Sequence, residues 1–140
     1  MSGGDSTKTK FFTESNIKNW KKVNFFLEGQ FYKYKIKTQK NKIIMACEEI
    51  FVNICKYAYK NTGQVEITLD FDDKTAKIEI ADSGIAFDPL SFCADKEIDK
   101  DYKERKIGGM GIYMVKNTMD KLEYKRKDSK NYFLMFKNLC

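Results

Sequence analysis

Three short segments of this chain carry residue types that suit the chemistry of a nucleotide polyphosphate. Glu49 and Asn53 stand four residues apart, so on a helix they would offer a base and a hard oxygen ligand on one side. Two glycine-bearing segments follow, Asp82-Ser83-Gly84-Ile85-Ala86-Phe87-Asp88-Pro89 and Gly108-Gly109-Met110-Gly111. Glycine has no Cβ, so its backbone can approach a ligand closely. Together the three segments predict a nucleotide-phosphate and magnesium site, which neither glycine segment would predict alone.

The pair Glu49 and Asn53 lies within residues 38–59, the segment with the strongest helical periodicity. One broad apolar face is formed there by Ile43, Ile44, Cys47, Ile50, Phe51, Ile54, Cys55 and Ala58. At about 100° per residue, Glu49 and Asn53 fall on one shoulder of this face, whereas Glu48 projects on the other side. A carboxylate on such a shoulder can line a pocket. The alternative is a solvated Glu49 and an Asn53 on the helix surface.

The first glycine-bearing segment follows a predicted β-hairpin. Apolar residues alternate with polar ones on both sides of a turn at 72–74, namely Val65, Ile67 and Leu69 before it and Ala76, Ile78 and Ile80 after it. The second strand leads directly into Asp82. The carboxylate at that position is either a turn former or a ligand contact.

The second glycine-bearing segment precedes a short predicted helix with Ile112, Met114, Val115 and Met119 on its apolar side. Backbone N–H groups at a helix N-terminus suit a polyphosphate, and the helix dipole adds to this preference. The alternative is a flexible turn that caps the helix. The charged stretch 90–106 just upstream is weakly periodic, and it is either a functional lid or a disordered segment.

The remaining elements complete an α+β domain. Residues 10–13 predict a short strand, a helix follows from Ile17 with Gly29 at its end, and residues 31–37 fit helix or strand equally. Residues 122–126 and 132–136 predict a closing hairpin around 128–129. This order predicts a two-layer α/β sandwich, with a mostly antiparallel sheet and helices on one face. We expect residues 1–10 to be a flexible end and 11–140 to be one domain.

Composition narrows the chemistry. The 140 residues contain no His, which excludes Ser-His-Asp and Cys-His nucleophiles, a Cys/His zinc site and a phosphorylated His. The four cysteines show no paired metal-ligand spacing and are interpreted as reduced structural thiols. No apolar run approaches the length of a membrane span and no leader opens the chain, so a soluble, cytoplasmic protein is expected.

The net charge is +6, which fits a nucleic acid, an acidic protein partner or a phosphorylated ligand. The lysines are scattered, with clusters only at 33–42 and 125–130. Scattered lysines usually form a solvated surface, and no recognisable nucleic-acid-binding module accompanies them. The charge balance therefore does not predict direct binding to nucleic acid.

The order and spacing of the three motifs resemble the ATP-binding domain of the GHKL superfamily, which includes gyrase-type ATPases, heat-shock chaperones and histidine kinases. The chain is most similar to the stand-alone serine/threonine-protein kinases that act as bacterial anti-sigma factors. The resemblance covers about 11–137 and rests on residues 48–53 (Glu-Glu-Ile-Phe-Val-Asn), on Asp82-Ser83-Gly84 with Phe87-Asp88-Pro89, and on Gly108-Gly109-Met110-Gly111-Ile112. It implies the Bergerat ATP-binding fold, with ATP and Mg²⁺ as cofactors.

The resemblance also implies a role for each motif. The residue matching Glu49 acts as a base or positions the attacking water or hydroxyl, and the residue matching Asn53 binds Mg²⁺. Asp82 is expected to accept a hydrogen bond from the adenine amino group, directly and through water, and Gly84 to let the adenine approach. The phosphates are expected to contact Gly108, Gly109, Met110 and Gly111. Arg105 resembles a lid arginine, although its spacing to the glycines differs by two residues. Two departures are Ala86, where the family pattern has a second Gly, and 129–131, where many relatives place Gly-Thr.

The function implied by the resemblance is an ATP-dependent serine/threonine-protein kinase that also sequesters a sigma factor. Its substrate would be a serine or threonine of a small anti-sigma-factor antagonist, and a homodimer is typical of the family. A second hypothesis is a non-catalytic, nucleotide-sensing binding module of the same fold. A third is a fragment of a two-component histidine kinase, which ranks last because the chain has no His.

Overall fold

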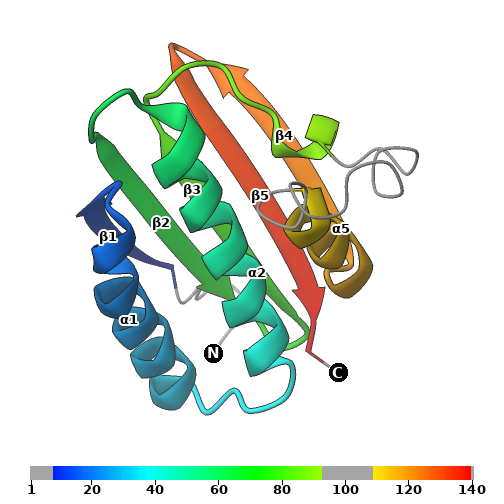
Figure 1. Ribbon diagram of the computed structural model, residues 1–140. Coiled ribbons are helices and arrows are strands. Elements are labelled where there is room, and N and C mark those ends of the chain that lie inside the picture. The colour runs from blue at the N-terminus through cyan, green and yellow to red at the C-terminus, as the bar shows by residue number, and fades with distance from the viewer. Residues whose placement is uncertain (1–7, 93–108, 140) are drawn as a thin grey trace.

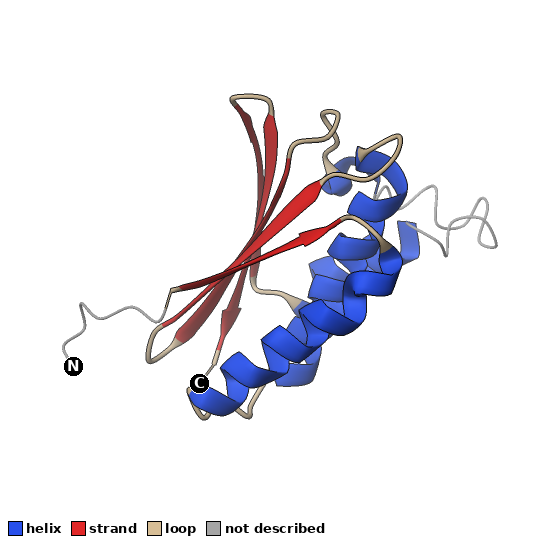
Figure 2. Ribbon diagram, turned by 90° about the vertical axis from the view of Figure 1, so that its left-hand side faces the viewer, coloured by secondary structure: helices blue, strands red, loops and turns tan. Residues whose placement is uncertain are grey.

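The structure is a computed structural model that describes residues 8–92 and 109–139. Within these residues, a five-stranded antiparallel sheet forms one layer and helices cover one of its faces (Figure 1, Figure 2). The strands are β1 (Thr9–Glu14), β2 (Gln64–Phe71), β3 (Thr75–Asp82), β4 (Lys121–Lys127) and β5 (Lys130–Asn138), and the helices are α1 (Trp20–Lys33), α2 (Lys40–Asn53) and α5 (Gly109–Thr118). Shorter helical segments are η1 (Ile17–Asn19), η2 (Ile54–Ala58) and η3 (Pro89–Phe92). This architecture confirms the predicted fold class.

The sheet has the order β1-β2-β3-β5-β4, so β5 lies between β3 and β4. Both predicted hairpins are present. The β2–β3 register pairs Ile67 with Ile80, and the β3–β5 register pairs Asp82 with Asn131. Apolar side chains buried along one face of β2 and β3 meet the helices, as the alternation predicts. The register places Asp82, the predicted adenine contact, directly opposite Asn131 near the start of β5.

Helix α1 continues past Gly29, so the prediction that this glycine ends the helix is wrong. The chain leaves the helix instead at Lys35, which adopts a left-handed backbone (φ 58°). There the N–H of Ile36 donates to the carbonyl of Phe31 at 2.9 Å, and the N–H of Lys35 donates to that of Tyr32 at 3.1 Å. These two bonds form a Schellman motif, in which the left-handed position is usually glycine. Residues 31–37, for which the sequence fitted helix or strand, therefore form the end of α1 and the turn after it.

Helix α2 and the π-helical segment η2 together form the helix predicted over 38–59. Ile43, Cys47, Ile50 and Phe51 are fully buried between the sheet and the neighbouring helices. The thiol of Cys47 is buried, which raises its pKa to about 12 and keeps it protonated. This agrees with the prediction of a structural thiol.

Aromatic side chains fix α1 and α2 on the sheet. Phe31 at the end of α1 packs on Phe71 of β2 with ring centroids 5.3 Å apart, and Trp20 at its start packs on Phe51 of α2 at 6.0 Å. Such pairs add about 0.5–1.5 kcal/mol each beyond the burial of their area. Both ends of α1 are thereby held, which keeps α2 in place between α1 and α5.

Helix α5 and the β4–β5 hairpin close the domain as predicted. Asp128 (φ 53°) and Ser129 (φ 65°) both have left-handed backbones, the combination required by a two-residue type I′ turn. At the other end, the buried Lys137 donates to the carbonyl of Thr118, where a cation also favours the C-terminal end of the helix dipole. Among the described residues no helix is long and apolar enough to span a membrane.

Candidate functional site

The predicted site residues that the structure describes gather where α2 and η2 meet the end of β3 and the start of α5 (Figure 1). Glu49 and Asn53 come from α2, Asp82 and Gly84 from the end of β3 and the turn after it, and Gly111 from the first turn of α5. Two close approaches join these elements, one between α5 and α2 and the other between the β3 turn and η2. Both depend on glycine.

Gly111 lies directly against the carboxyl group of Glu49. A Cβ at position 111 would stand 1.9 Å from Cδ of Glu49 and 2.1 Å from each carboxylate oxygen. A side chain at position 111 would displace the Glu49 carboxyl group, so glycine allows α5 and this carboxyl group to lie in direct contact. The second glycine-bearing segment therefore meets the predicted base, a contact that sequence spacing alone did not predict.

The carboxyl group of Glu49 is poised to exchange a proton near neutral pH. Burial raises its pKa from the usual 4.5 to about 7, and the negative charge of Glu48 adds to the rise. The amide of Asn53 and the charge of Lys56 act in the opposite direction, because both favour the ionised form. A carboxylate with a pKa near the operating pH is well suited to general base catalysis.

Asn53 is fully buried, which excludes the alternative of an asparagine on the helix surface. Its amide is close enough to lower the pKa of Glu49, yet neither Oδ1 nor Nδ2 completes a hydrogen bond among the described residues. Oε2 of Glu49 likewise has no partner there. An unpaired buried polar group costs about 1–3 kcal/mol, so these atoms are arranged for something other than the stability of the apo fold.

These orphan atoms fit a magnesium ion held by few protein ligands. The described residues contain no group of three or more acidic, Cys or His side chains that could bind a metal by themselves. Mg²⁺ prefers oxygen ligands and usually keeps several waters, binding through one or two protein groups together with substrate phosphates. Oδ1 of Asn53, beside the Glu49 carboxyl, supplies one such group. The donor set therefore fits Mg²⁺ on a phosphate and does not fit a fully protein-bound metal.

Gly84 makes the second close approach, against the last residue of η2. A Cβ there would stand 2.2 Å from the carbonyl oxygen of Ala58, and the same carbonyl accepts the N–H of Ile85 at 2.9 Å. The π-helical geometry of η2 ends the helix with this carbonyl turned toward the β3 turn. Gly84 thus joins the turn after Asp82 to the helix that carries Glu49 and Asn53.

Asp82 is almost completely buried at the end of β3, and one of its oxygens is already occupied. Oδ1 accepts the N–H of Gly84 at 2.8 Å and Nδ2 of Asn131 at 2.9 Å. Burial raises the pKa of this carboxyl group, whereas the two donors and the charge of Arg126 lower it. Both donors bind Oδ1, so the side chain acts as a turn former, and Oδ2 is the oxygen through which it could accept from a ligand.

Asn131 and Arg126 are site residues that the sequence reasoning did not assign. Nδ2 of Asn131 also donates to the carbonyl of Ile85 at 2.7 Å, and Nη1 of Arg126 donates to the carbonyl of Gly84 at 2.8 Å. Oδ1 of Asn131 accepts from Arg126 at 3.2 Å and from the hydroxyl of Tyr124. Together they hold the Gly84 turn onto β4 and β5. Asn131 could have been found from its pairing with Asp82 across β3 and β5, but that pairing is known only once the strand register is known.

The phosphate side of the predicted site is described only in part. Helix α5 begins at Gly109, so the glycine-bearing segment lies at a helix N-terminus as predicted, but Gly109, Met110 and Gly111 form the first turn of the helix instead of preceding it. Arg105 and Gly108 lie outside the described residues, and so does most of the 90–106 stretch. Contacts of Gly108, Gly109, Met110 and Arg105 with a phosphate therefore stay predictions.

Comparison with known proteins identifies the fold around this site. A family model described as the histidine kinase-like ATPase domain matches residues 35–137, which include every predicted site residue. This chain belongs to the histidine kinase-like ATPase family. The match begins at the turn between α1 and α2 and ends at Lys137, near the end of β5, so α1 and β1 lie outside it.

Curated relatives of this ATPase domain are named as kinases. Over 82 residues the chain is 28% identical to the serine-protein kinase RsbW of Listeria monocytogenes serotype 4a (strain HCC23), with 54% of this chain and 52% of the relative covered. The RsbW of Listeria innocua serovar 6a is also 28% identical, over 81 residues. The chain thus spans about half the length of the curated relatives it matches.

Solved structures confirm the ATPase fold. The crystal structure of the RsbU and RsbW domains of Rv1364c from Mycobacterium tuberculosis superposes with a TM-score of 0.66 at 12% identity, covering 94% of this chain and 32% of that one. The Acinetobacter baumannii histidine kinase AdeS superposes with a TM-score of 0.52 at 14% identity, covering 92% of this chain and 68% of that one. At these identities the likeness concerns the fold alone.

Proposed function

We propose that this histidine kinase-like ATPase domain binds MgATP between Asp82 and Gly111 and transfers the γ-phosphoryl group to a protein hydroxyl. The observation that carries the proposal is the contact of Glu49 with Gly111, beside a fully buried Asn53 whose amide has no partner in the described part of the chain. A base and a free oxygen ligand meet there at the start of a helix. This is the combination that phosphoryl transfer needs and that simple nucleotide binding does not.

Each residue has a defined task in the proposal. Oδ2 of Asp82 accepts the adenine amino N–H, while Asn131 and the N–H of Gly84 hold Oδ1 and so fix the direction of the carboxylate. Oδ1 of Asn53 would be the protein ligand for Mg²⁺, which would supply charge neutralisation at the phosphates. The N–H groups at the start of α5 face the polyphosphate.

Glu49 acts on the acceptor. Its carboxylate accepts the proton of the attacking hydroxyl as the new O–P bond forms and the bond from the γ-phosphorus to the bridging oxygen of ADP breaks. Gly111 confines the carboxylate, because no other residue type leaves it in place. Phosphoryl transfer depends mainly on positioning, so this confinement is part of the mechanism.

The acceptor is proposed to be a serine or threonine of a small anti-sigma-factor antagonist in the cytoplasm, and the second partner a sigma factor that this protein sequesters. Support comes from the names of the relatives, serine-protein kinase RsbW, and from the anti-sigma kinase pattern in residues 82–89. Phosphorylation would release the antagonist, whereas the unphosphorylated antagonist would displace the sigma factor.

A nucleotide-sensing module without kinase activity is the second candidate. The pocket alone would serve such a role, because nucleotide binding can order a neighbouring segment for a partner. The pKa of Glu49 near 7 favours chemistry, since a binder gains nothing from a half-buried carboxyl group whose pKa is raised toward neutral pH.

Incubation with γ-labelled ATP, Mg²⁺ and a candidate antagonist protein separates the two. The kinase proposal predicts label on a serine or threonine of the antagonist, and it predicts that Glu49→Ala abolishes labelling while ATP binding is largely retained. Binding of ATP without transfer by the wild-type protein would support the module. Normal turnover by Glu49→Ala would show that Glu49 is not the base.

A further inference from the structure

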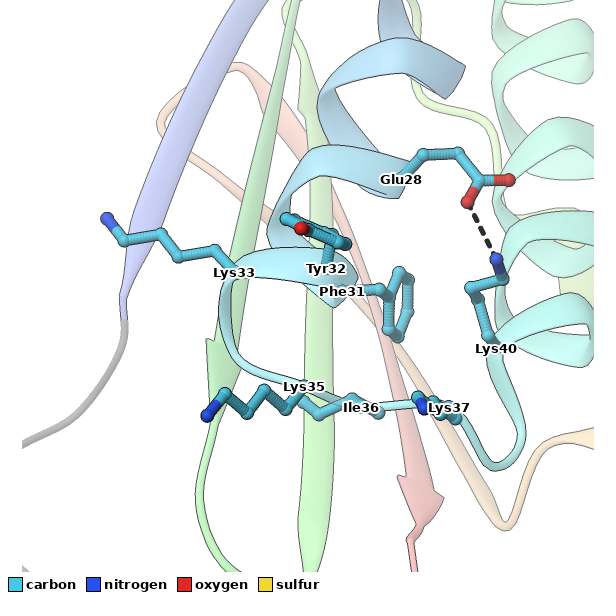
Figure 3. Close-up of a pocket in the computed structure, with 8 residues that line it drawn as sticks. All are labelled: Glu28, Phe31, Tyr32, Lys33, Lys35, Ile36, Lys37 and Lys40. Atoms are coloured by element: carbon cyan, nitrogen blue, oxygen red, sulfur yellow. Dashed lines mark hydrogen bonds and ion pairs between the residues drawn. The ribbon is translucent and has the colours of Figure 1, made fainter.

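A cavity of about 990 Å³ lies where α1 turns into α2, away from the nucleotide site (Figure 3). Lys40, which lines it, stands nine residues before Glu49 in α2, about 14 Å along a helix that rises ~1.5 Å per residue. The volume is in the range of sites that hold a side chain or a small ligand, roughly 300–1,000 Å³. Nothing in the proposed kinase mechanism uses this cavity.

The rim of the cavity is strongly basic. Four lysines line it, Lys33, Lys35, Lys37 and Lys40, against one carboxylate, Glu28, which is paired with Lys40 at 2.8 Å. Figure 3 shows Lys33 and Lys35 extended toward one side and the Glu28–Lys40 pair on the other. No carboxylate of the described residues lies within ion-pair distance of Lys33, Lys35 or Lys37, all of which are exposed.

The floor of the cavity is apolar and well anchored. Phe31 is 1% exposed and packs on Phe71, and Ile36 is partly buried against the same core. The Schellman motif fixes both residues relative to each other through the bond from the N–H of Ile36 to the carbonyl of Phe31. Tyr32 is 87% exposed beside this floor, so an aromatic ring is available at the rim.

Lys35 adopts a backbone conformation that costs free energy for any residue with a side chain. It occupies the left-handed site of the Schellman motif, where glycine is favoured and a side chain costs roughly 1–2 kcal/mol. Gln39, just before α2, is also left-handed (φ 66°). Lys35 thus keeps a side chain at a position where glycine would be less strained, in the middle of the basic rim.

We propose that this cavity is a docking site for an acidic segment of a partner protein. An apolar side chain of that segment would rest on Ile36 and the exposed ring of Tyr32, above the buried Phe31, and its carboxylates would pair with Lys33, Lys35 and Lys37. The apolar floor favours a protein over a nucleic acid, because a phosphate backbone has no apolar group to bury and instead follows longer basic tracks. The proposal does not rest on the kinase assignment.

A peptide-binding experiment tests the proposal with a synthetic probe. The probe is a short fluorescein-labelled peptide that alternates Glu with Leu, and binding is measured by fluorescence anisotropy at low and high salt. Three competitors accompany it: a Glu/Ser peptide, a Lys/Leu peptide and single-stranded DNA. The pocket variant is Lys33→Gln, Lys35→Gln, Lys37→Gln. The matched control is Lys18→Gln, Lys74→Gln, Lys127→Gln, which removes the same charge from exposed lysines outside the cavity.

The expected result is salt-sensitive binding of the Glu/Leu peptide that falls about tenfold in the pocket variant and less than about twofold in the control variant. Thermal melting and ATP binding should be unchanged in both variants, which separates loss of docking from loss of the fold. Four results would overturn the proposal: no binding, equal loss in both variants, equal binding of the Glu/Ser peptide, or tighter binding of DNA that depends on the same lysines.

Discussion

The contact between Gly111 and Glu49 gives the sharpest prediction about catalysis. In Gly111→Ala the new Cβ would start 1.9 Å from Cδ of Glu49, whereas carbon atoms in ordinary contact are about 3.5–4.0 Å apart. The carboxyl group must therefore move by about 1.5 Å or more. Because it is the end of a flexible side chain, the cost to folding is small, about 1 kcal/mol, and the higher helix propensity of Ala offsets most of it.

Catalysis should suffer far more than stability. A displacement of about 1 Å of a catalytic group can lower a rate by about 10²-fold, so we expect kcat for phosphoryl transfer to fall roughly 10- to 100-fold. ATP affinity should change by only a few fold, because Asp82 is untouched. The assay is single-turnover transfer from γ-labelled ATP to the acceptor protein at saturating ATP, with chemical denaturation run in parallel.

Gly29→Ala is the matched control. It makes the same change in the interior of α1, where a Cβ would have no atom within 4 Å. This variant should gain about 0.5–1 kcal/mol of stability from helix propensity and keep full activity. If Gly111→Ala transferred phosphate as fast as Gly29→Ala, Glu49 would not need the position that the structure gives it.

Five further predictions concern pH, nucleotide binding and stability. Because the base must be ionised, kcat should rise with pH through about 7, the pKa of Glu49, and Glu49→Gln should remove that rise along with most activity. Since the folded protein binds the extra proton between pH 4.5 and about 7, the wild type should lose stability relative to Glu49→Gln as pH rises through that window, measured by urea unfolding. Asp82→Asn should weaken ATP binding at least about tenfold by calorimetry, because a hydrogen bond to a charged group contributes about 1.5–3 kcal/mol; unchanged affinity would mean that adenine lies elsewhere. Asn131→Ala should also weaken ATP binding, and the loss should grow as pH falls, because losing its donor raises the pKa of Asp82 further; a loss independent of pH would indicate a purely structural role. Lys35→Gly should raise the free energy of unfolding by about 0.5–1 kcal/mol, and a decrease would show that the left-handed backbone is not strained there.

The parts of the fold that follow from local patterns were predictable from the sequence. Burial of Cys47 and Phe51 on one helix face and the alternation that ends at Asp82 both depend on side-chain periodicity, which the sequence displays directly. The type I′ turn at Asp128 was placed correctly because two strands with one buried face flank it. Local periodicity is strong wherever an element has a single buried face.

Features that depend on tertiary contacts were not predictable. Gly29 does not end α1, although the sequence predicted that it would. Packing of Phe31 on the sheet extends the helix, and Lys35 adopts the left-handed backbone that glycine usually provides at a helix end. Asn131 became a site residue only through the β3–β5 register. Asn53 looked like a shoulder residue, yet the approach of neighbouring elements buries it completely. Register and close approach are set by the whole fold, so no single segment encodes them.

A crystal structure with Mg²⁺ and a non-hydrolysable ATP analogue tests the central claim most directly. The account predicts the adenine amino group on Oδ2 of Asp82, the metal on Oδ1 of Asn53, and the γ-phosphate at the start of α5 facing the carboxyl group of Glu49. A nucleotide bound elsewhere, or a metal held without Asn53, would contradict it.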